Sequence, residues 1–158
     1  MAVEVERKFL VSGNEWRNEV AHSVVIRQAY LSFTLAMAIR IRIVDGVAAF
    51  LTIKSAAPGL ARSEFEYPIP LADAYGLIAL RTGNVIEKRR HLVRIGGMQW
   101  EVDVFEGEHE GLVIAEIELP DADATFERPS WLGKEVTGEA RYYNVNLAGA
   151  HQIADTAW

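Results

Sequence analysis

Apolar and polar residues alternate with a period of two along most of the chain, which is typical of strands that bury one face. Two dipeptides, Asp45-Gly46 and Gly96-Gly97, stand between such runs and favour tight hairpins, because these residues accept a positive φ. We therefore expect a mostly antiparallel sheet. The runs predict eight strands, at residues 2–11, 24–33, 37–44, 47–55, 62–69, 85–94, 98–106 and 112–119.

Helical periodicity is limited to three segments, near residues 14–20, 71–82 and 138–150. The second segment follows Pro70, which suits a helix start, and Gly83 stands where a glycine commonly ends a helix. No linker or internal repeat divides the 158 residues. We expect one domain over residues 1–158, of the α+β class, with the apolar strand faces covered by the helices or by another sheet.

The polar face of the predicted strands carries like charges two residues apart. Such neighbours repel one another, so strand propensity alone would not select them. One doublet by itself is an ordinary solvated strand face, but the whole set predicts a surface arranged for a ligand. Its members are Glu4, Glu6, Lys8, Arg40, Arg42, Lys54, Glu64, Glu66, Lys88, Arg90, Glu101, Asp103, Glu116 and Glu118.

The charges on this face indicate what the ligand is. Lysines and arginines on separate strands suit a polyanion with several phosphate groups. The acids outnumber the bases in this set, so the face would repel such a polyanion unless cations intervene. Oxygen ligands suit Mg²⁺ or Mn²⁺. The sequence therefore predicts a site for divalent metal and polyphosphate.

Composition excludes several other classes. The chain has no cysteine, which rules out thiol nucleophiles, disulfides and zinc–thiolate sites. A net charge of −6 is unfavourable for binding duplex nucleic acid. Glu4, Glu6, Arg7 and Lys8 are charged where a signal peptide would be apolar, and the longest apolar run, residues 46–53, is far short of a membrane helix. We expect a cytoplasmic protein with no membrane partner.

The segment Glu4-Val5-Glu6-Arg7-Lys8 resembles the N-terminal E-x-E-x-K signature of the CYTH superfamily, the triphosphate tunnel metalloenzymes. The later charged pairs follow in the order of the family pattern, so the resemblance extends to about residue 119. It implies an eight-stranded antiparallel β-tunnel, a closed barrel with flanking helices, whose charged lumen binds a triphosphate and a divalent metal ion. The chain looks like the short, single-domain bacterial members.

Within this resemblance each charged residue has an expected role. The expected metal ligands are Glu4, Glu6, Glu116 and Glu118, with Glu64, Glu66 and Asp103 as further ligands or as holders of metal-bound water. The residues expected to line the phosphates and to act in catalysis are Lys8, Arg40, Arg42, Lys54, Lys88 and Arg90. Tyr30 is added to the catalytic set as a side chain that points into the tunnel, with a packing role as the alternative.

The family includes several activities. We expect a metal-dependent hydrolase acting on inorganic tripolyphosphate, because the sequence offers no evident aromatic clamp for a base. The alternatives are a nucleoside or thiamine triphosphatase or a class IV adenylyl cyclase. A non-catalytic polyphosphate- or nucleotide-binding module is a further alternative, but it would need fewer carboxylates. The sequence leaves open whether the protein forms a homodimer.

Overall fold

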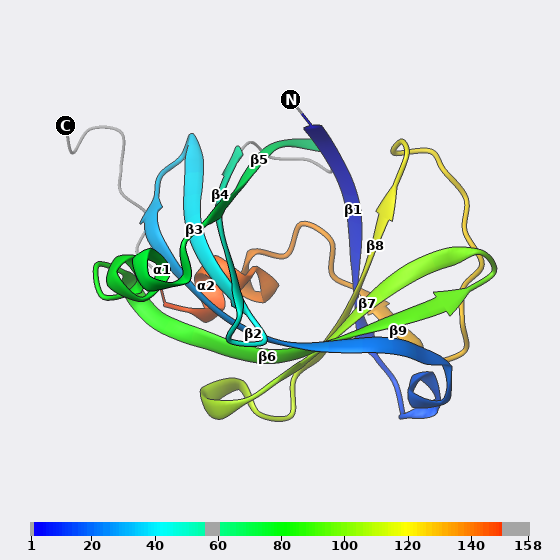
Figure 1. The fold of residues 1–158 in the computed structure, drawn as a ribbon. Helices are drawn as coiled ribbons and strands as arrows, with labels where there is room; N and C mark the ends of the chain where they lie inside the picture. Colours follow the sequence, from blue (N-terminus) through cyan, green and yellow to red (C-terminus); the bar gives the residue numbers. More distant parts are fainter. Residues whose placement is uncertain (1, 56–60, 150–158) are drawn as a thin grey trace.

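The computed structural model describes residues 2–55 and 61–149, and for residues 2–4 and 61 only the backbone. Figure 1 shows a ring of strands with short helices around it. The strands are β1 (Ala2–Val11), β2 (Val20–Phe33), β3 (Met37–Val44), β4 (Ala48–Ser55), β5 (Ala61–Ile69), β6 (Thr82–Ile95), β7 (Met98–Phe105), β8 (Val113–Leu119) and β9 (Leu132–Glu135). The helices are α1 (Leu71–Ile78) and α2 (Asn144–Leu147), with 3₁₀ turns η1 (Glu15–Glu19), η2 (Gly107–His109) and η3 (Ala140–Tyr142).

Eight of the strands close into a barrel, and all the neighbouring pairs are antiparallel. The order β5-β4-β3-β2-β6-β7-β8-β1 is completed by a pairing of β1 with β5, which joins residues 2–5 to residues 61–64. Further along β1, residues 9–11 pair with β9 instead of β5. Strand β9 is therefore an additional strand and not one of the eight that close the barrel. The prediction of an eight-stranded antiparallel tunnel is confirmed.

Both predicted hairpins are present. Asp45 and Gly46 join β3 to β4 with φ values of 53° and 69°. Gly96 and Gly97 join β6 to β7 with φ values of 57° and 77°. Positive φ at both central residues is what a two-residue hairpin needs to match the twist of its strands.

The helical predictions were too long. The segment 14–20 forms only η1, held by the buried Trp16, because Val20 already pairs with Val93. Helix α1 ends at Ile78, so Gly83 lies within β6 and not at the end of the helix. The segment 138–150 forms η3 and the single turn α2 rather than one helix, and residue 150 is outside the described residues. Strand β9 was not predicted, because apolar and polar residues do not alternate in its sequence, Leu-Gly-Lys-Glu.

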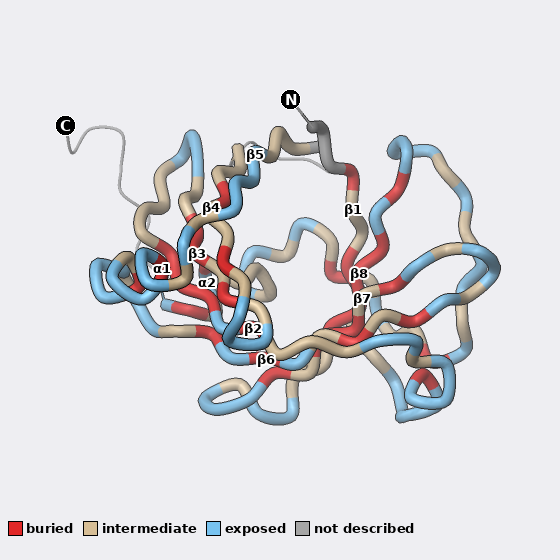
Figure 2. Tube along the Cα trace, viewed as in Figure 1, coloured by how far each residue is buried: buried red, intermediate tan, exposed pale blue. Residues whose placement is uncertain are grey.

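Much of the apolar core lies on the outer side of the barrel. Helix α1 covers one part, where Ala74 and Ile78 pack on Ile41 and Ile43. The loop after β8 and η1 cover another part, rich in tryptophan, that includes Trp16, Trp100 and Trp131. Figure 2 shows buried positions along the strands, with the connecting loops exposed. The inner face of the sheet is therefore left to polar side chains.

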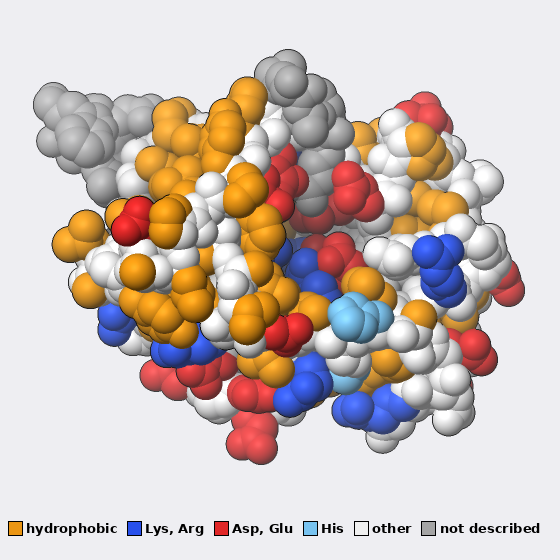
Figure 3. Space-filling model, viewed as in Figure 1, with side chains coloured by type: hydrophobic (Ala, Val, Ile, Leu, Met, Phe, Trp, Pro, Cys, Tyr) orange, Lys and Arg blue, Asp and Glu red, His pale blue; other side chains and the backbone are white. Residues whose placement is uncertain are grey.

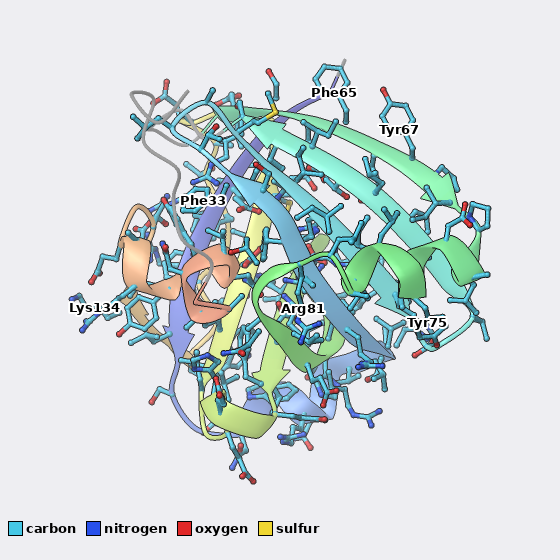
Figure 4. All side chains as sticks on the ribbon, turned by 90° about the vertical axis from the view of Figure 1, so that its left-hand side faces the viewer. Phe33, Phe65, Tyr67, Tyr75, Arg81 and Lys134 are labelled. Atoms are coloured by element: carbon cyan, nitrogen blue, oxygen red, sulfur yellow. The ribbon has the colours of Figure 1, made fainter. Side chains whose placement is uncertain are left out.

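At one end of the tunnel the inner face changes from charged to apolar. Ile86, Phe105 and Ile114 lie two residues from Lys88, Asp103 and Glu116 and so face the same way. These three apolar side chains form a buried cluster with Val145 and Ala148 around α2, and Phe33 packs against it. In the side view of Figure 4, Phe33 lies beside the C-terminal helices. We call this the closed end of the tunnel.

No helix among the described residues is both long and apolar enough to cross a membrane.

Candidate active site

A cavity of about 400 Å³ lies inside the ring of strands, and every strand of the ring contributes to its wall. Figure 3 shows the hollow near the middle of the face, with acidic and basic side chains at its base. The charged residues on the wall are Glu6, Lys8, Arg40, Arg42, Lys54, Arg62, Glu64, Glu66, Lys88, Arg90, Glu101, Glu116 and Glu118. Neutral side chains complete it, among them Tyr30, Phe33, Thr52, Tyr143, Asn144 and Val145.

The structure brings most of the predicted site residues together. All of them line the cavity except two: the side chain of Glu4 lies outside the described residues, and Asp103 is placed behind the wall. Tyr30 lines the cavity and also packs into the apolar cluster of the closed end. The period of two along each strand was sufficient to select these side chains, because the ring turns one face of each strand inward.

Asp103 forms ion pairs with two basic residues of the cavity wall, Lys88 and Arg90. It is 1% exposed, and its oxygens accept hydrogen bonds from Arg90 Nε and Nη2 at 2.8 and 2.9 Å. Lys88 Nζ lies 2.7 Å from the same carboxylate. Burial alone would raise the pKa of Asp103, but Arg90 and Lys88 hold it well below its usual value. Asp is shorter than Arg and Lys, so the longer side chains reach past it to the cavity.

Arg90 is the most firmly held of the basic residues. Besides Asp103, it contacts Glu101, with 2.6 Å between Nη1 and the carboxylate oxygen. Burial favours loss of the proton from Arg90, but Asp103 and Glu101 outweigh it and raise the pKa of Arg90. Burial also raises the pKa of Glu101. The guanidinium is thus fixed in one orientation toward the cavity.

The buried cations destabilise one another's charge. Burial, together with Arg90 and Arg42, lowers the pKa of Lys88 to about 7 in spite of Asp103. Burial, together with Arg40 and Arg90, lowers the pKa of Arg42 to about 9. A polyanion in the cavity would remove this repulsion. The cluster of Arg40, Arg42, Lys88 and Arg90 therefore has the electrostatics of an anion site.

A hydroxyl links the next basic residue to an acid. Thr52 Oγ1 is fully buried, accepts a hydrogen bond from Arg40 Nη2 at 3.2 Å and donates to Glu66 Oε2 at 3.2 Å. Arg40 Nε is buried and has no hydrogen-bond partner among the described residues. Arg40 is thus held at one nitrogen and retains donor capacity.

The acidic part of the wall is built on β1 and β8. Glu6 lies directly opposite Glu118 in the register of these strands, and Lys8 lies opposite Glu116. Lys8 Nζ is 3.4 Å from Glu116 Oε1, and the charges of Glu116 and Glu6 raise the pKa of Lys8 against the effect of burial. Two carboxylates opposite each other repel unless a cation lies between them. Within the described part of the chain, no three Asp, Glu or His side chains are close enough to hold a metal ion unaided.

Several wall residues were not predicted. Arg62 lies on the same face of β5 as Glu64 and Glu66, so the period of two could have predicted it. Its guanidinium lies 4.7 Å from the ring centroid of Tyr143. Tyr143 and Asn144 belong to the C-terminal segment and had no signal in the sequence. The described wall holds seven basic and six acidic residues, so the predicted excess of acid is not present there.

The CYTH domain family matches residues 2–148 of this chain. The chain belongs to the CYTH family. This confirms the family resemblance that the E-x-E-x-K segment and the later charged pairs indicated.

Two CYTH relatives match nearly the whole chain. The inorganic triphosphatase of Acetivibrio thermocellus is 45% identical over 148 residues, which cover 93% of this chain and 94% of that protein. The inorganic triphosphatase of Nitrosomonas europaea is 37% identical over 149 residues, covering 92% and 96%. A crystal structure of an inorganic triphosphatase superposes with a TM-score of 0.69 at 34% identity, over 97% of this CYTH chain and 99% of the other.

Proposed function

We propose that this CYTH protein is an enzyme that hydrolyses inorganic triphosphate to diphosphate and phosphate. The observation that carries the proposal is the cavity wall, where seven basic side chains from five strands surround one space of about 400 Å³. An elongated polyanion is the ligand that such an arrangement binds from all sides. The inorganic triphosphatases to which the chain is 45% and 37% identical support the same activity.

Hydrolysis requires a new P–O bond from water to a phosphorus atom while the anhydride P–O bond on its other side breaks, with diphosphate leaving. Phosphoryl transfer depends mainly on positioning and on neutralising charge. We assign this work to Lys8, Arg40, Arg42, Lys54, Lys88 and Arg90, with Arg62 as an addition. Asp103 is then a positioning residue for Lys88 and Arg90 rather than a metal ligand. Tyr30 remains a proposed contact at the closed end.

The acidic residues fit a divalent cation, Mg²⁺ or Mn²⁺. Their donors are all oxygens, and Glu6 and Glu118 face each other across β1 and β8. We propose that these two would hold the ion, with Glu4, Glu64, Glu66 and Glu116 as further candidate ligands; Mg²⁺ in proteins commonly takes its remaining ligands from water and substrate phosphates. Such an ion supplies charge neutralisation and a more acidic bound water.

A second candidate is hydrolysis of an organic triphosphate, because Phe33, Tyr143 and Val145 add an apolar part to the wall. One of these side chains is already in use, because Lys8 and Arg62 both lie over the Tyr143 ring, at 4.9 and 4.7 Å from its centroid. Inorganic triphosphate needs no such apolar contact and stays the first choice.

The test is kcat/KM for diphosphate, tripolyphosphate, ATP and thiamine triphosphate, each with Mg²⁺ and with Mn²⁺. We expect tripolyphosphate to be hydrolysed at least about tenfold better than ATP, and diphosphate poorly, because binding energy realised only with the full chain appears in kcat/KM. Faster hydrolysis of ATP or thiamine triphosphate, or formation of cyclic AMP, would replace this proposal with the second candidate or with a cyclase.

A further inference from the structure

The C-terminal segment contributes a polar side chain to the cavity wall at the closed end of the tunnel. Asn144, the first residue of α2, lines the cavity, while its neighbour Val145 is buried in the apolar cluster at this end. Tyr142 O lies 3.4 Å from Lys8 Nζ, which ties the segment to β1. In Figure 1 this segment lies behind the ring of strands. A ligand in the tunnel that reaches the closed end therefore meets Asn144.

Two hydrogen bonds fix which way the Asn144 amide is turned. Arg42 Nε, which can only donate, lies 2.9 Å from Gln28, so the atom it meets must be the amide oxygen of Gln28. The amide nitrogen of Gln28 then donates to Asn144 at 3.0 Å, and the receiving atom must be Oδ1. Lys88 Nζ lies 2.9 Å from the same oxygen. The orientation rests on Arg42 and Gln28 and does not depend on whether Lys88 carries its proton.

The Nδ2 group of Asn144 is consequently left with its hydrogens unused. Nδ2 makes no hydrogen bond to a described residue. It is also not among the fully buried polar atoms of the described residues that lack a partner. This amide nitrogen is therefore solvent-accessible, and it belongs to a residue that lines the cavity. The neighbouring wall residues Lys88 and Arg42 are cations that would draw an anionic oxygen to this place.

We propose that Asn144 is a substrate-binding residue, whose Nδ2 group donates a hydrogen bond to a phosphate oxygen of the triphosphate at the closed end. This inference rests on the proposed function for the identity of the ligand. The Oδ1 atom of this amide accepts a hydrogen bond from Lys88, and its Nδ2 group donates one to the phosphate. Asn144 thus adds a neutral, directional donor to a site otherwise made of charges.

The test uses the whole protein in excess chelator, where tripolyphosphate binding is measured by calorimetry and by NMR without turnover. On titration with tripolyphosphate, the side-chain amide signals of Asn144 should shift strongly. Those of Gln28 should shift less, since that amide points to Asn144 and not to the cavity. Asn144→Ala should raise the Kd about tenfold, the loss expected for a hydrogen bond to a charged group.

Asn146→Ala is the matched control, because Asn146 is exposed on the same helix and bonds Ala140 O outside the cavity. Its Kd should stay within about twofold of the wild-type value. Unshifted Asn144 amide signals at saturating tripolyphosphate would overturn the inference, as would an unchanged Kd in Asn144→Ala. Wild-type protein that binds tripolyphosphate but does not hydrolyse it with Mg²⁺ or Mn²⁺ would overturn the proposed function alone. A wild type that neither binds tripolyphosphate in chelator nor hydrolyses it with Mg²⁺ or Mn²⁺ would overturn both.

Discussion

At the scale of single residues, the tunnel combines two kinds of charge. Some charges are paired within the wall, as Asp103 is with Arg90 and Lys88. Others are crowded by charges of the same sign, as Arg42 is by Arg40 and Arg90. The two kinds should respond differently to substitution, since a lost partner leaves a buried charge uncompensated while a lost repulsion relieves one.

Asp103→Asn should therefore damage both stability and activity. It removes the anion from a fully buried group with two cations, for which about 3 kcal/mol of unfolding free energy is expected. The Arg90 orientation is lost with it, so kcat/KM should fall at least about tenfold. Urea unfolding and steady-state kinetics measure the two effects. Glu101→Gln is the control, because Glu101 contacts Arg90 at only one nitrogen, so smaller losses of stability and kcat/KM are expected. Equal losses in the two variants would contradict a special role for Asp103.

Arg42→Ala and Lys54→Ala should leave the fold intact. Each removes one of the seven basic residues that share the cavity, and the loss of Arg42 also relieves its repulsion by Arg40 and Arg90. We expect Tm to stay within about 4 °C of wild type, which corresponds to about 1 kcal/mol for a domain of this size. The kcat/KM for tripolyphosphate should fall by about 100-fold or more. Early melting with unchanged catalysis per folded molecule would mean that these charges are structural.

The sequence correctly predicted which side chains line the cavity where charged residues recur at every second position of a strand, as at Glu6, Lys8 and Arg40. For Asp103 it did not foresee the position behind the cavity wall, because alternation gives the face of a residue but not how far its side chain reaches. Gln28 and Asn144 were not found since neutral amides carry no charge pattern. Asn144 also comes from a segment that meets β2 and β6 only in the folded chain.

At the scale of elements, the contact between η1 and the outer face of β2 and β6 carries a titratable group. His91 is 7% exposed, its Nδ1 lies 2.7 Å from Ser23 Oγ, and its ring centroid is 5.0 Å from that of Trp16. Burial, together with Arg17 and Arg89, lowers the pKa of His91. The folded protein therefore favours the neutral imidazole at this position.

This shift predicts a loss of stability in mild acid. The unfolded chain takes up a proton at about pH 6.5, whereas the folded chain does so only at lower pH. The unfolding free energy should thus be unaffected by His91 above that pH and should decrease as the pH falls through the window below it. Urea titrations from pH 8 to 5 should show a shallower decrease for His91→Gln than for wild type. His22→Gln, at an exposed histidine of the neighbouring strand β2, is the control. Parallel curves for wild type and His91→Gln would contradict the prediction.

Strands were the elements that the sequence predicted best, since alternation of period two persists wherever one face is buried. The strand over residues 37–44 was predicted with the bounds that β3 has. The helical segments were overestimated because short apolar spacings fit one turn as well as three. The start of β2 at Val20 could not be seen locally, because pairing with Val93 on β6 decides it.

At the scale of the whole molecule, the barrel makes one charged chamber from every strand of the ring. We expect activity to require a divalent cation, because Glu6 and Glu118 face each other and the substrate is an anion. Hydrolysis of tripolyphosphate should stop in excess chelator and return with Mg²⁺ or Mn²⁺. Glu6→Gln and Glu118→Gln should each lower kcat by about 100-fold or more and raise the metal concentration needed for half-maximal rate. Full turnover in excess chelator would refute the metal role.

The closure of the barrel through β1 has a consequence for how the protein is made. The partners of this first strand lie at residues 61–64, 114–119 and 132–135. On a ribosome, β1 leaves the exit tunnel first but has no partner along one edge until more than a hundred further residues have followed. Pairings so distant in sequence are slow to form, and an unpaired strand is open to wrong neighbours in the meantime. Glu6 and Lys8, charged side chains at alternate positions of β1, line the cavity of the folded protein. Charges on an unpaired strand also disfavour its association with other nascent chains.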